Sequence, residues 1–525
     1  MNKQGIMLNE DSDHFLHTRM DIIEKVDRVY LKKFIEQYKN SDVTDFLMCI
    51  YGMLTTYPSV YKTAYADKYY KTEELGQTVD YKNGISRSAH ILWDEKNLDM
   101  YAIWIEECRN IGINPWLSYR MNDAHCHFDV PNALTSDTFY EHLDDWARVR
   151  HRERNGYYDR CRDFEIKGVR DEFLNCLRES LQRYDPYGIE LDFQREFDCF
   201  QIGHEWSSKE LMTAFIGEVK SVVQNAEKNW GHKIKIAIRC HPDPASCLEL
   251  GFDIIKWAEL GYIDMYIASP RWYATDNDMP ITLWKQILKP YHVEVAGAIE
   301  INIASSSQFD GTNWLAPVMQ TVSTTLGTAA NILSQGADKV YLFNYMDTPN
   351  QMCNEEENFD TDEETLMRTD IKTPFLAGKG YKKLIQTAGT LEKIHKTMRR
   401  HIVTYTDKNP LWRKGNVIFP ATVSKMFPFY ARIATGTVPK KTKAFLKVGI
   451  REKILPETIG VYVNSCSVIY TGQEEAVAPI LTKSPLHVYK IPNEAIKSGV
   501  QIAEFITEET FTIDYIEITI VPMKK

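Results

Sequence analysis

Short apolar runs alternate with longer amphipathic stretches from the N-terminus to about residue 395. The apolar runs have the length of buried β-strands, and the stretches between them have the period of helices that pack on one face. The predicted strands are residues 5–8, 44–51, 115–120, 188–193, 234–239, 262–268, 293–301 and 340–345. Eight strands with helical crossovers predict a (β/α)8 TIM barrel. A doubly wound open sheet is the alternative, although no glycine-rich phosphate loop follows the first strand.

The helical period disappears after residue 400, where short β-rich runs are separated by turn residues. The runs at residues 445–450, 460–464, 486–491 and 512–521 are typical of an all-β sandwich. In the last run, isoleucines alternate with Glu517 and Thr519, which gives the strand two different faces. We therefore predict two domains, a barrel at residues 1–398 that carries the catalysis and a C-terminal β-sandwich at residues 399–525.

Two predicted connections, residues 52–95 and 121–169, are longer than loops usually are. Both follow a strand, so both are expected on the catalytic face of the barrel. The first is rich in tyrosine, which is compatible equally with a roof over a cleft and with a loop that packs on itself.

The composition is that of a globular protein. Of the 525 residues, 44% are hydrophobic and 26% charged, which is enough to bury a core. The net charge of −10 provides no basic surface for nucleic acid or for an anionic membrane. The first twenty residues lack the apolar region of a signal peptide, and the ten cysteines are scattered without CxxC pairs. We expect a cytoplasmic protein with reduced thiols, and leave its oligomeric state open.

Polar residues cluster where seven of the eight predicted strands end. Because active sites of barrels lie at the carboxyl ends of the strands, these residues predict a polar pocket. The residues expected to bind a substrate are Arg120, Asn122, Asp123, His125, Arg239, His241, Asn302 and Asn344. Trp272 and Tyr273 are expected either to stack on a sugar ring or to pack within the protein.

Strand alternation singles out three carboxyl groups. In the fourth strand the apolar residues face the helices, which points Glu190 and Asp192 into the barrel. The same alternation points Glu300 inward at the end of the seventh strand. Buried carboxylates need partners, which Arg120 and Arg239 are placed to supply. We interpret Glu190, which lies deeper, as half of a structural ion pair, and Asp192 and Glu300 as functional groups.

One segment resembles a known family. A helix that opens with Val169 and Arg170 is followed by Y-D-P-Y-G-I-E-L-D-F-Q-R over residues 184–195. This pattern is similar to the fourth βα unit of glycoside-hydrolase-like barrels, often described as family-10-like or hypothetical glycosyl hydrolases. The resemblance implies a barrel, glycoside hydrolysis and a functional aspartate at Asp192, with Arg195 as the arginine that follows it. Tyr187 replaces the aspartate that the family usually has, so any role of that acid is absent.

The C-terminal region carries a second resemblance. The turn at residues 488–501, which ends in Ser498, Gly499, Val500 and Gln501, is similar to a turn of jelly-roll modules that are appended to many glycosidases. Gln501 stands where those modules usually have asparagine. The resemblance implies a packing partner for the barrel in preference to a sugar-binding module.

Glycoside hydrolysis needs one carboxylic acid and one carboxylate. The fourth and seventh strands lie across the mouth of a barrel, a placement that also resembles the acid pairs of the large barrel-glycosidase clan. We therefore expect Asp192 and Glu300 to be catalytic, without a cofactor, and an oligosaccharide or glycoside to be the substrate. Glu196, Asp123 and Asp276 remain possible replacements within the pair.

Two other classes of function remain open. His125 and His127, together with His241, resemble the His-x-His ligands of metal-dependent amidohydrolases, although there the motif follows the first strand. The alternative role for these histidines is to line a polar sugar pocket. The third possibility is a barrel that binds carbohydrate without cleaving it, because a fold does not fix a function.

Overall fold

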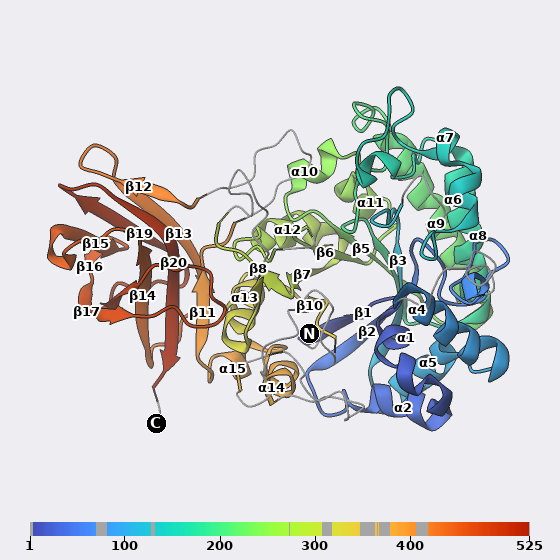
Figure 1. Cartoon of the computed structure of the whole chain (residues 1–525), viewed down its shortest axis with the longest axis horizontal. Helices are drawn as coiled ribbons and strands as arrows, with labels where there is room; N and C mark the ends of the chain where they lie inside the picture. Colours follow the sequence, from blue (N-terminus) through green and yellow to red (C-terminus); the bar gives the residue numbers. More distant parts are fainter. Residues whose placement is uncertain are drawn as a thin grey trace.

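The computed structural model describes residues 4–69, 81–127, 132–271, 274–306, 318–346, 363–364, 366, 379–405 and 418–523. Eight parallel strands close into a barrel in the order β1-β10-β7-β6-β5-β4-β3-β2, which confirms the predicted (β/α)8 fold (Figure 1). These strands are β1 (Ile6–Glu10), β2 (Val43–Tyr51), β3 (Asn114–Arg120), β4 (Gly188–Asp192), β5 (Lys235–Cys240), β6 (Met265–Ala268), β7 (Glu294–Glu300) and β10 (Lys339–Phe343). A short hairpin, β8 (Asn302–Ile303) with β9 (Val318–Met319), follows β7.

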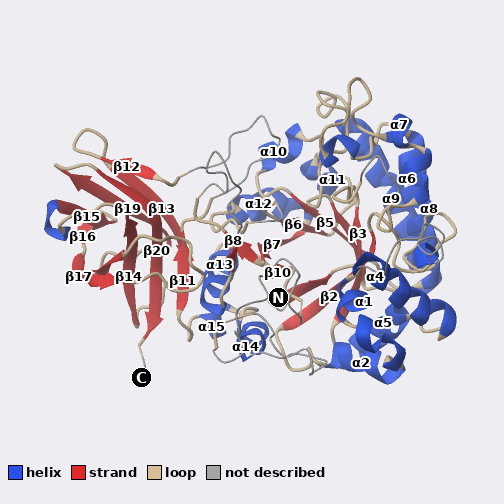
Figure 2. Ribbon diagram, viewed as in Figure 1, coloured by secondary structure: helices blue, strands red, loops and turns tan. Residues whose placement is uncertain are grey.

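Helices surround the barrel on its outer face, as Figure 2 shows. They are α1 (His14–Thr18), α2 (Arg28–Glu36), α4 (Tyr81–His90), α5 (Met100–Ile111), α6 (Asp137–Glu141), α7 (Leu143–Trp146), α8 (Lys167–Arg183), α9 (Lys209–Trp230), α10 (Pro244–Glu249), α11 (Ile254–Glu259), α12 (Ile281–Leu288), α13 (Val322–Ser334), α14 (Lys379–Thr387) and α15 (Leu391–Ile394). Their apolar faces and the outward side chains of the strands form one continuous core. A separate cluster fills the barrel, with Met7, Leu47, Trp116, Ile267 and Phe343 among its members. Strand alternation therefore separates outward from inward residues as the sequence predicts.

The C-terminal region is made of antiparallel sheets. One sheet has the order β11-β20-β14-β18-β17, with β12 also paired to β20, and the other has the order β13-β19-β15-β16. Their strands are β11 (Arg399–Ile402), β12 (Ala421–Val423), β13 (Phe429–Gly436), β14 (Thr442–Ile450), β15 (Ile459–Val463), β16 (Cys466–Ser467), β17 (Ile469–Glu474), β18 (Leu486–Ile491), β19 (Gly499–Thr507) and β20 (Phe511–Pro522). A shared apolar core joins Ile433 and Phe505 of one sheet to Leu446 and Ile518 of the other, which makes the region a β-sandwich.

The barrel and the sandwich are in direct contact. β11 lies against α13 so closely that a side chain at Gly327 would collide with the backbone of Arg400. A small apolar cluster joins Ile303 of the hairpin after β7 to Ile402, Leu486 and Tyr515 of the sandwich. The hairpin that continues the seventh barrel strand is therefore held partly by the C-terminal region. The domain boundary at residue 398 stays a prediction.

The first long connection is not structureless, because it contains α4 and a π-helical turn (Ile91–Glu95). Within it, Tyr57 and Tyr65 are buried, and the Tyr57 hydroxyl donates to the carbonyl of Cys176 in α8 at 3.1 Å. Tyr57 therefore packs on the barrel and does not roof a cleft.

No helix in the described ranges is long and apolar enough to cross a membrane. The nine cysteines that the structure describes are free thiols, and seven of them are buried.

Candidate active site

Asp192, at the end of β4, is ion-paired with Arg239 of β5. The two residues are partners in the parallel register, so their side chains point into the barrel together. Arg239 Nη1 lies 2.9 and 2.8 Å from the two carboxylate oxygens, and the N–H of Gln194 donates to Oδ1 at 2.9 Å. Both side chains are 1% exposed. The guanidinium and the backbone donor both stabilise negative charge on the Asp192 side chain.

Glu300, at the end of β7, is a second inward carboxyl group with a different environment. Its Oε1 accepts a hydrogen bond from Asn344 Nδ2 at 2.9 Å and from the N–H of Ile301 at 3.0 Å. Its Oε2 is buried and has no hydrogen-bond partner within the described parts of the chain. Burial raises the pKa of Glu300 to about 7, although Asn344 and Arg239 favour the charged form. Glu300 therefore holds a proton up to about neutral pH.

The ion pair that we expected for Glu190 is made by Asp192 instead. Glu190 is fully buried, and its Oε2 accepts a hydrogen bond from Ser118 Oγ at 2.5 Å. Its register partner on β5 is Ala237, and no Lys, Arg or His of the described residues forms an ion pair with it. Burial and the nearby charge of Asp192 raise the pKa of Glu190 to about 7.

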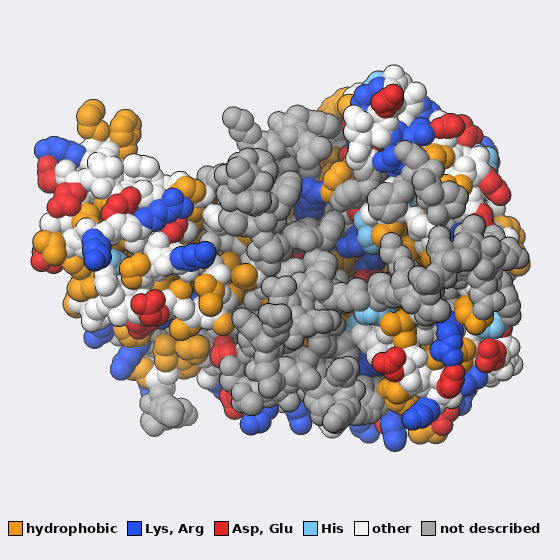
Figure 3. All heavy atoms as spheres, viewed as in Figure 1, with side chains coloured by type: hydrophobic (Ala, Val, Ile, Leu, Met, Phe, Trp, Pro, Cys, Tyr) orange, Lys and Arg blue, Asp and Glu red, His pale blue; other side chains and the backbone are white. Residues whose placement is uncertain are grey.

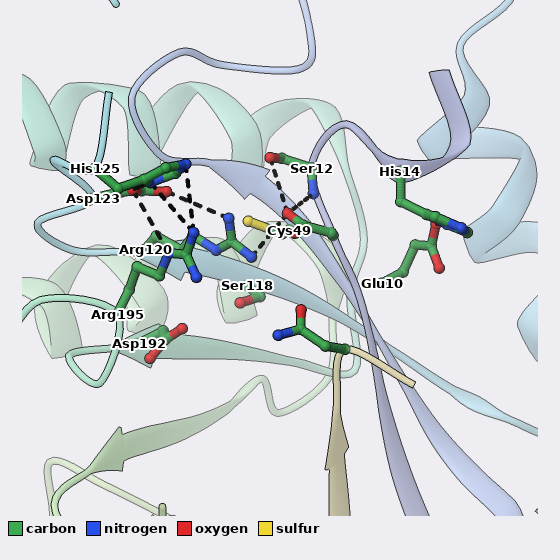
Figure 4. Close-up of polar contacts among 12 residues, drawn as sticks. Glu10, Ser12, His14, Cys49, Ser118, Arg120, Asp123, His125, Asp192 and Arg195 are labelled. Atoms are coloured by element: carbon green, nitrogen blue, oxygen red, sulfur yellow. Dashed lines mark hydrogen bonds and ion pairs between the residues drawn. The ribbon is translucent and has the colours of Figure 1, made fainter. Parts of the chain in front are cut away.

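A second polar cluster lies where β1 and β3 end. Arg120 Nη2 is 2.8 Å from Asp11 Oδ1, and Arg120 Nη1 is 3.4 Å from Asp123 Oδ2. Asp123 also binds Nδ1 of His125, and Arg195 Nη2 lies 3.3 and 3.4 Å from the two ring nitrogens of that histidine. Figure 4 shows Arg120 and Arg195 turned toward Asp123 and His125, with Asp192 nearby. Burial would raise the pKa of Asp123, but His125 and the two arginines hold it well below its usual range.

Glu196 completes this cluster from the loop after β4. It is fully buried, and its Oε2 accepts a hydrogen bond from the N–H of Ala124 at 3.3 Å. Burial and the charge of Asp123 raise the pKa of Glu196 well above its usual range. Glu196 therefore retains a proton beside an ionised Asp123, so this pair too has one acid and one carboxylate.

The three histidines of the metal hypothesis do not come together. His127 is buried and stacks on Phe139, with 3.7 Å between the ring centroids. His241 lines a cavity of about 300 Å³ between the barrel rim and the sandwich, and its Nδ1 accepts from the N–H of Asp243 at 3.1 Å. Within the described residues, the group of donor atoms close enough to share a metal ion includes neither His127 nor His241, so the proposed donor set of His125, His127 and His241 is wrong.

Another donor set has the spacing of a metal site. Asp123, His125 and Glu196 each offer one ligand atom within 4.8 Å of the others, the one such group in the described residues. The guanidinium of Arg195 lies against the ring nitrogens of His125, and Arg120 binds Asp123. Two cations in contact with the donors oppose a third, so this set fits a metal poorly.

The remaining predicted residues divide into three groups. Asn122 does not face the mouth freely, because its side chain binds the backbone of Arg162 and Asp198. Asn302 pairs with Met319 in the hairpin after β7, and Asp276 lines the same cavity as His241. Trp272 and Tyr273 lie outside the described residues.

Several residues of the site escape the sequence reasoning. In the second cluster, Arg195 faces Asp123 and Asp11 pairs with Arg120, although we did not place Arg195 and Asp11 among the binding residues. Asn344 was expected to touch substrate, but its side chain holds Glu300. Its φ of 63° is a left-handed conformation that asparagine adopts more readily than most residues, and this turn directs the amide back to the barrel. An asparagine directly after a barrel strand is the sequence signal for such a turn.

No known protein family matches the sequence, and no curated protein is similar to it. Among solved structures, the chain is similar to chitinase ChiW from Paenibacillus sp., with 10% identity, a TM-score of 0.38, and coverage of 95% of this chain and 52% of that chain. This chain therefore spans about half the length of that chitinase.

Two further solved structures are similar to the chain. The α-fucosidase of Thermotoga maritima has 10% identity and a TM-score of 0.34, over 94% of this chain and 81% of that chain. A glycoside hydrolase family 18 N-acetylglucosaminidase of Paenibacillus barengoltzii has 10% identity and a TM-score of 0.33, over 65% and 95%. These neighbours are glycosidases, the enzyme class of the barrels that the sequence resembles.

Proposed function

We propose that the protein is a glycoside hydrolase in which Glu300 is the general acid and Asp192 the catalytic carboxylate. The observation that carries the proposal is the difference between these two carboxyl groups. Asp192 is ion-paired with Arg239, whereas Glu300 has a buried oxygen without a partner in the described residues and a pKa of about 7. Environments that keep one carboxyl group charged and the other protonated are what acid-assisted glycosidic cleavage requires.

In this proposal, Glu300 donates its proton to the glycosidic oxygen as the bond to the anomeric carbon breaks. Asp192 supplies negative charge to the developing oxocarbenium ion and either attacks the anomeric carbon or activates a water. Arg239 interacts electrostatically with both carboxyl groups, so Asp192 and Glu300 lie in the same interior of the barrel. It forms a direct ion pair with Asp192 and lowers the pKa of Glu300 from farther away, against the effect of burial.

The proposed substrate is a neutral glycoside or oligosaccharide. Three arginines of the mouth face an acid: Arg120 is 2.8 Å from Asp11, Arg239 is 2.8 Å from Asp192, and Arg195 Nε is 3.8 Å from Asp123. An anionic sugar would have to compete with these carboxylates for the same guanidinium groups. Figure 3 shows acidic, basic and histidine side chains beside one another over the middle of the barrel, which is a mixed and not a single-sign surface.

The C-terminal sandwich is part of the proposal as a packing partner of the barrel, in contact with the hairpin that follows Glu300. We also propose a cytoplasmic location, with which the free thiols agree because a reducing compartment keeps cysteines unpaired.

A metal-dependent hydrolase is the second candidate, and the spacing of Asp123, His125 and Glu196 is the observation in its favour. Exhaustive chelation separates the two candidates. A two-carboxylate enzyme keeps its activity, whereas a metal enzyme loses it and regains it when zinc or manganese is added.

The experiment that tests the proposed activity is a screen of nitrophenyl glycosides and neutral oligosaccharides with the whole chain. Cleavage that is lost in both Asp192→Asn and Glu300→Gln supports the proposal. Binding of a saccharide without cleavage, for example in calorimetric titrations, would replace it with the non-catalytic carbohydrate-binding barrel.

A further inference from the structure

Two side chains from outside the barrel strands hold the backbone carbonyl of Glu300 at short distance, and the Tyr345 hydroxyl also donates to it at 3.4 Å. Thr275 Oγ1 and Gln320 Nε2 each donate to it at 2.7 Å, and Gln320 Nε2 also donates to Thr275 Oγ1 at 2.8 Å. Both side chains are buried, at 0% and 2% exposure. Thr275 lies in the loop after β6, and Gln320 lies between β9 and α13. Two segments that are far apart in the sequence therefore converge on one carbonyl oxygen.

The backbones of the same two residues hold the segment that follows Glu300. The N–H of Gln320 donates to the carbonyl of Ile301 at 2.8 Å, and the N–H of Thr275 donates to the carbonyl of Asn302 at 2.9 Å. Three consecutive carbonyl groups, beginning with the last residue of β7, thus have fixed partners. The conformation of this end of the strand is thus set by the loop after β6 and by the short β8–β9 pairing.

We call the side chains of Thr275 and Gln320 the clamp. The geometry of the peptide group links this clamp to the carboxyl group of Glu300. The carbonyl of Glu300 and the N–H of Ile301 belong to one planar peptide unit, and in a trans peptide they point in opposite directions. Fixing the oxygen on one side therefore fixes the direction of the N–H on the other. That N–H donates to Glu300 Oε1 at 3.0 Å.

The two oxygens of Glu300 consequently have different environments. Oε1 is held by the N–H of Ile301 and by Asn344 Nδ2. Oε2 is buried without a hydrogen-bond partner in the described residues. An oxygen that already accepts two donated hydrogen bonds is disfavoured as the site of the proton, because the proton would face those donors.

We propose that Thr275 and Gln320 are positioning residues that, through the peptide between Glu300 and Ile301, hold Oε1 and leave Oε2 as the oxygen that carries the transferable proton. This inference rests on the proposed function for its meaning in catalysis. The positioning itself is a property of the fold and has a signature that does not depend on substrate.

The signature is the titration of Glu300. A hydrogen bond to the charged form of a carboxyl group lowers its pKa, so a peptide that loses its clamp and turns away raises the pKa. Thr275→Val removes the hydroxyl and keeps the shape of the side chain, whereas Thr275→Ser keeps the hydroxyl. Gln320→Leu removes the amide donor at similar volume.

The experiment is a ¹³C NMR titration of the whole chain labelled at the glutamate side-chain carboxyls, with the Glu300 resonance assigned by its absence in Glu300→Gln. We expect the pKa of Glu300 to rise by about half a unit or more in Thr275→Val and Gln320→Leu, the size of effect expected from one lost hydrogen bond to a charged group. Thr275→Ser should retain the wild-type titration. If Gln320→Leu does not fold, the comparison of Val with Ser at position 275 decides.

Gln501 provides a matched control in the sandwich. It is a fully buried glutamine whose Nε2 donates to Thr435 Oγ1 at 2.8 Å and to the carbonyl of Lys497 at 2.5 Å, the same kind of contact within the sandwich. Gln501→Leu should lower the melting temperature and leave the Glu300 titration unchanged.

An unchanged Glu300 titration in both Thr275→Val and Gln320→Leu would overturn the proposal. Thr275 and Gln320 would then contribute only to the packing of the loops. A shifted titration in a protein that cleaves no glycoside would support the clamp and reject the proposed function, so the two failures are distinct. In an active enzyme, the alkaline limb of kcat/KM should move to higher pH together with the titration.

Discussion

Arg239 binds both carboxylate oxygens of Asp192 through a single nitrogen, Nη1, at 2.9 and 2.8 Å. Its guanidinium also lies 3.8 Å from the ring centroid of Phe343 and donates from Nε to Ser269 Oγ at 3.1 Å. The cation is thus fixed on three sides within the barrel. Its loss would leave the buried Asp192 carboxylate without a counter-charge, with the N–H of Gln194 as its remaining hydrogen-bond donor among the described residues.

We predict that Arg239→Met lowers the free energy of unfolding by about 3–5 kcal/mol, the usual effect of removing one partner of a buried ion pair. Urea denaturation measures this change. Arg432→Met is the matched control, because Arg432 also pairs with an aspartate, Asp278, but is 56% exposed. That substitution should cost less than about 1 kcal/mol. Equal effects of the two substitutions would contradict a structural role for the Arg239 pair.

The second prediction concerns the pH dependence of activity. Glu300 has a pKa of about 7, and a general acid works only while it is protonated. On a glycoside with a poor leaving group, kcat/KM should therefore be constant just below pH 7 and fall as the pH rises above about 7, which gives the profile an alkaline limb. The Glu300→Gln variant, at its lower rate, should lack this alkaline limb. A limb that persists in this variant would assign the titration to another group.

The third prediction concerns stability and Glu190. The pKa of Glu190 in the fold is about 7, raised above the ordinary 4.5 by burial and by Asp192. The protonated form therefore contributes stability that is complete below pH 4.5 and is lost as the pH rises through 7. Between pH 4.5 and pH 8, the free energy of unfolding of Glu190→Gln should rise relative to that of wild type by up to about 3 kcal/mol. Chemical denaturation at each pH measures this difference.

Glu218→Gln, on the exposed side of α9, serves as a control for the removal of one negative charge. If the difference in free energy of unfolding between Glu190→Gln and wild type does not change with pH, Glu190 carries its charge in the fold, and an unrecognised cation must pair with it.

The fourth prediction concerns the domains. The charged, proline-containing stretch at residues 404–414 should be the first site of limited proteolysis, which would separate the barrel, with β11 still attached, from the rest of the sandwich. The two fragments should elute together in gel filtration, because Ile303 packs with Ile402, Leu486 and Tyr515 across the contact. A first cleavage within the barrel would contradict the boundary.

Much of the barrel follows from the sequence because apolar runs, strand alternation and helical period are local properties. The inward direction of Glu190, Asp192 and Glu300 was predictable for that reason. The partner of each acid was not, because alternation gives a direction but no register. In the structure Asp192 stands opposite Arg239, whereas Glu190 stands opposite Ala237, and this shift of two residues decides which acid is ion-paired.

The surroundings of Glu300 depend on long-range packing in the same way. Thr275 and Gln320 approach it from two loops, and no periodic pattern in the sequence brings them together. His127 follows the motif of a metal ligand, but its ring stacks on Phe139, a contact that depends on how the loop after β3 folds. Short motifs therefore identified the mouth of the barrel and could not assign roles within it.

The most direct test of the two-carboxylate account compares leaving groups. A dinitrophenyl glycoside departs without protonation, whereas an alkyl glycoside or oligosaccharide needs the general acid. Glu300→Gln should therefore reduce kcat/KM on the poor leaving group by at least about a hundredfold and on the dinitrophenyl glycoside only slightly, whereas Asp192→Asn should reduce both by at least about a hundredfold. Equal losses on both substrates in Glu300→Gln, or near-normal turnover in Asp192→Asn, would contradict the assignment of acid and carboxylate.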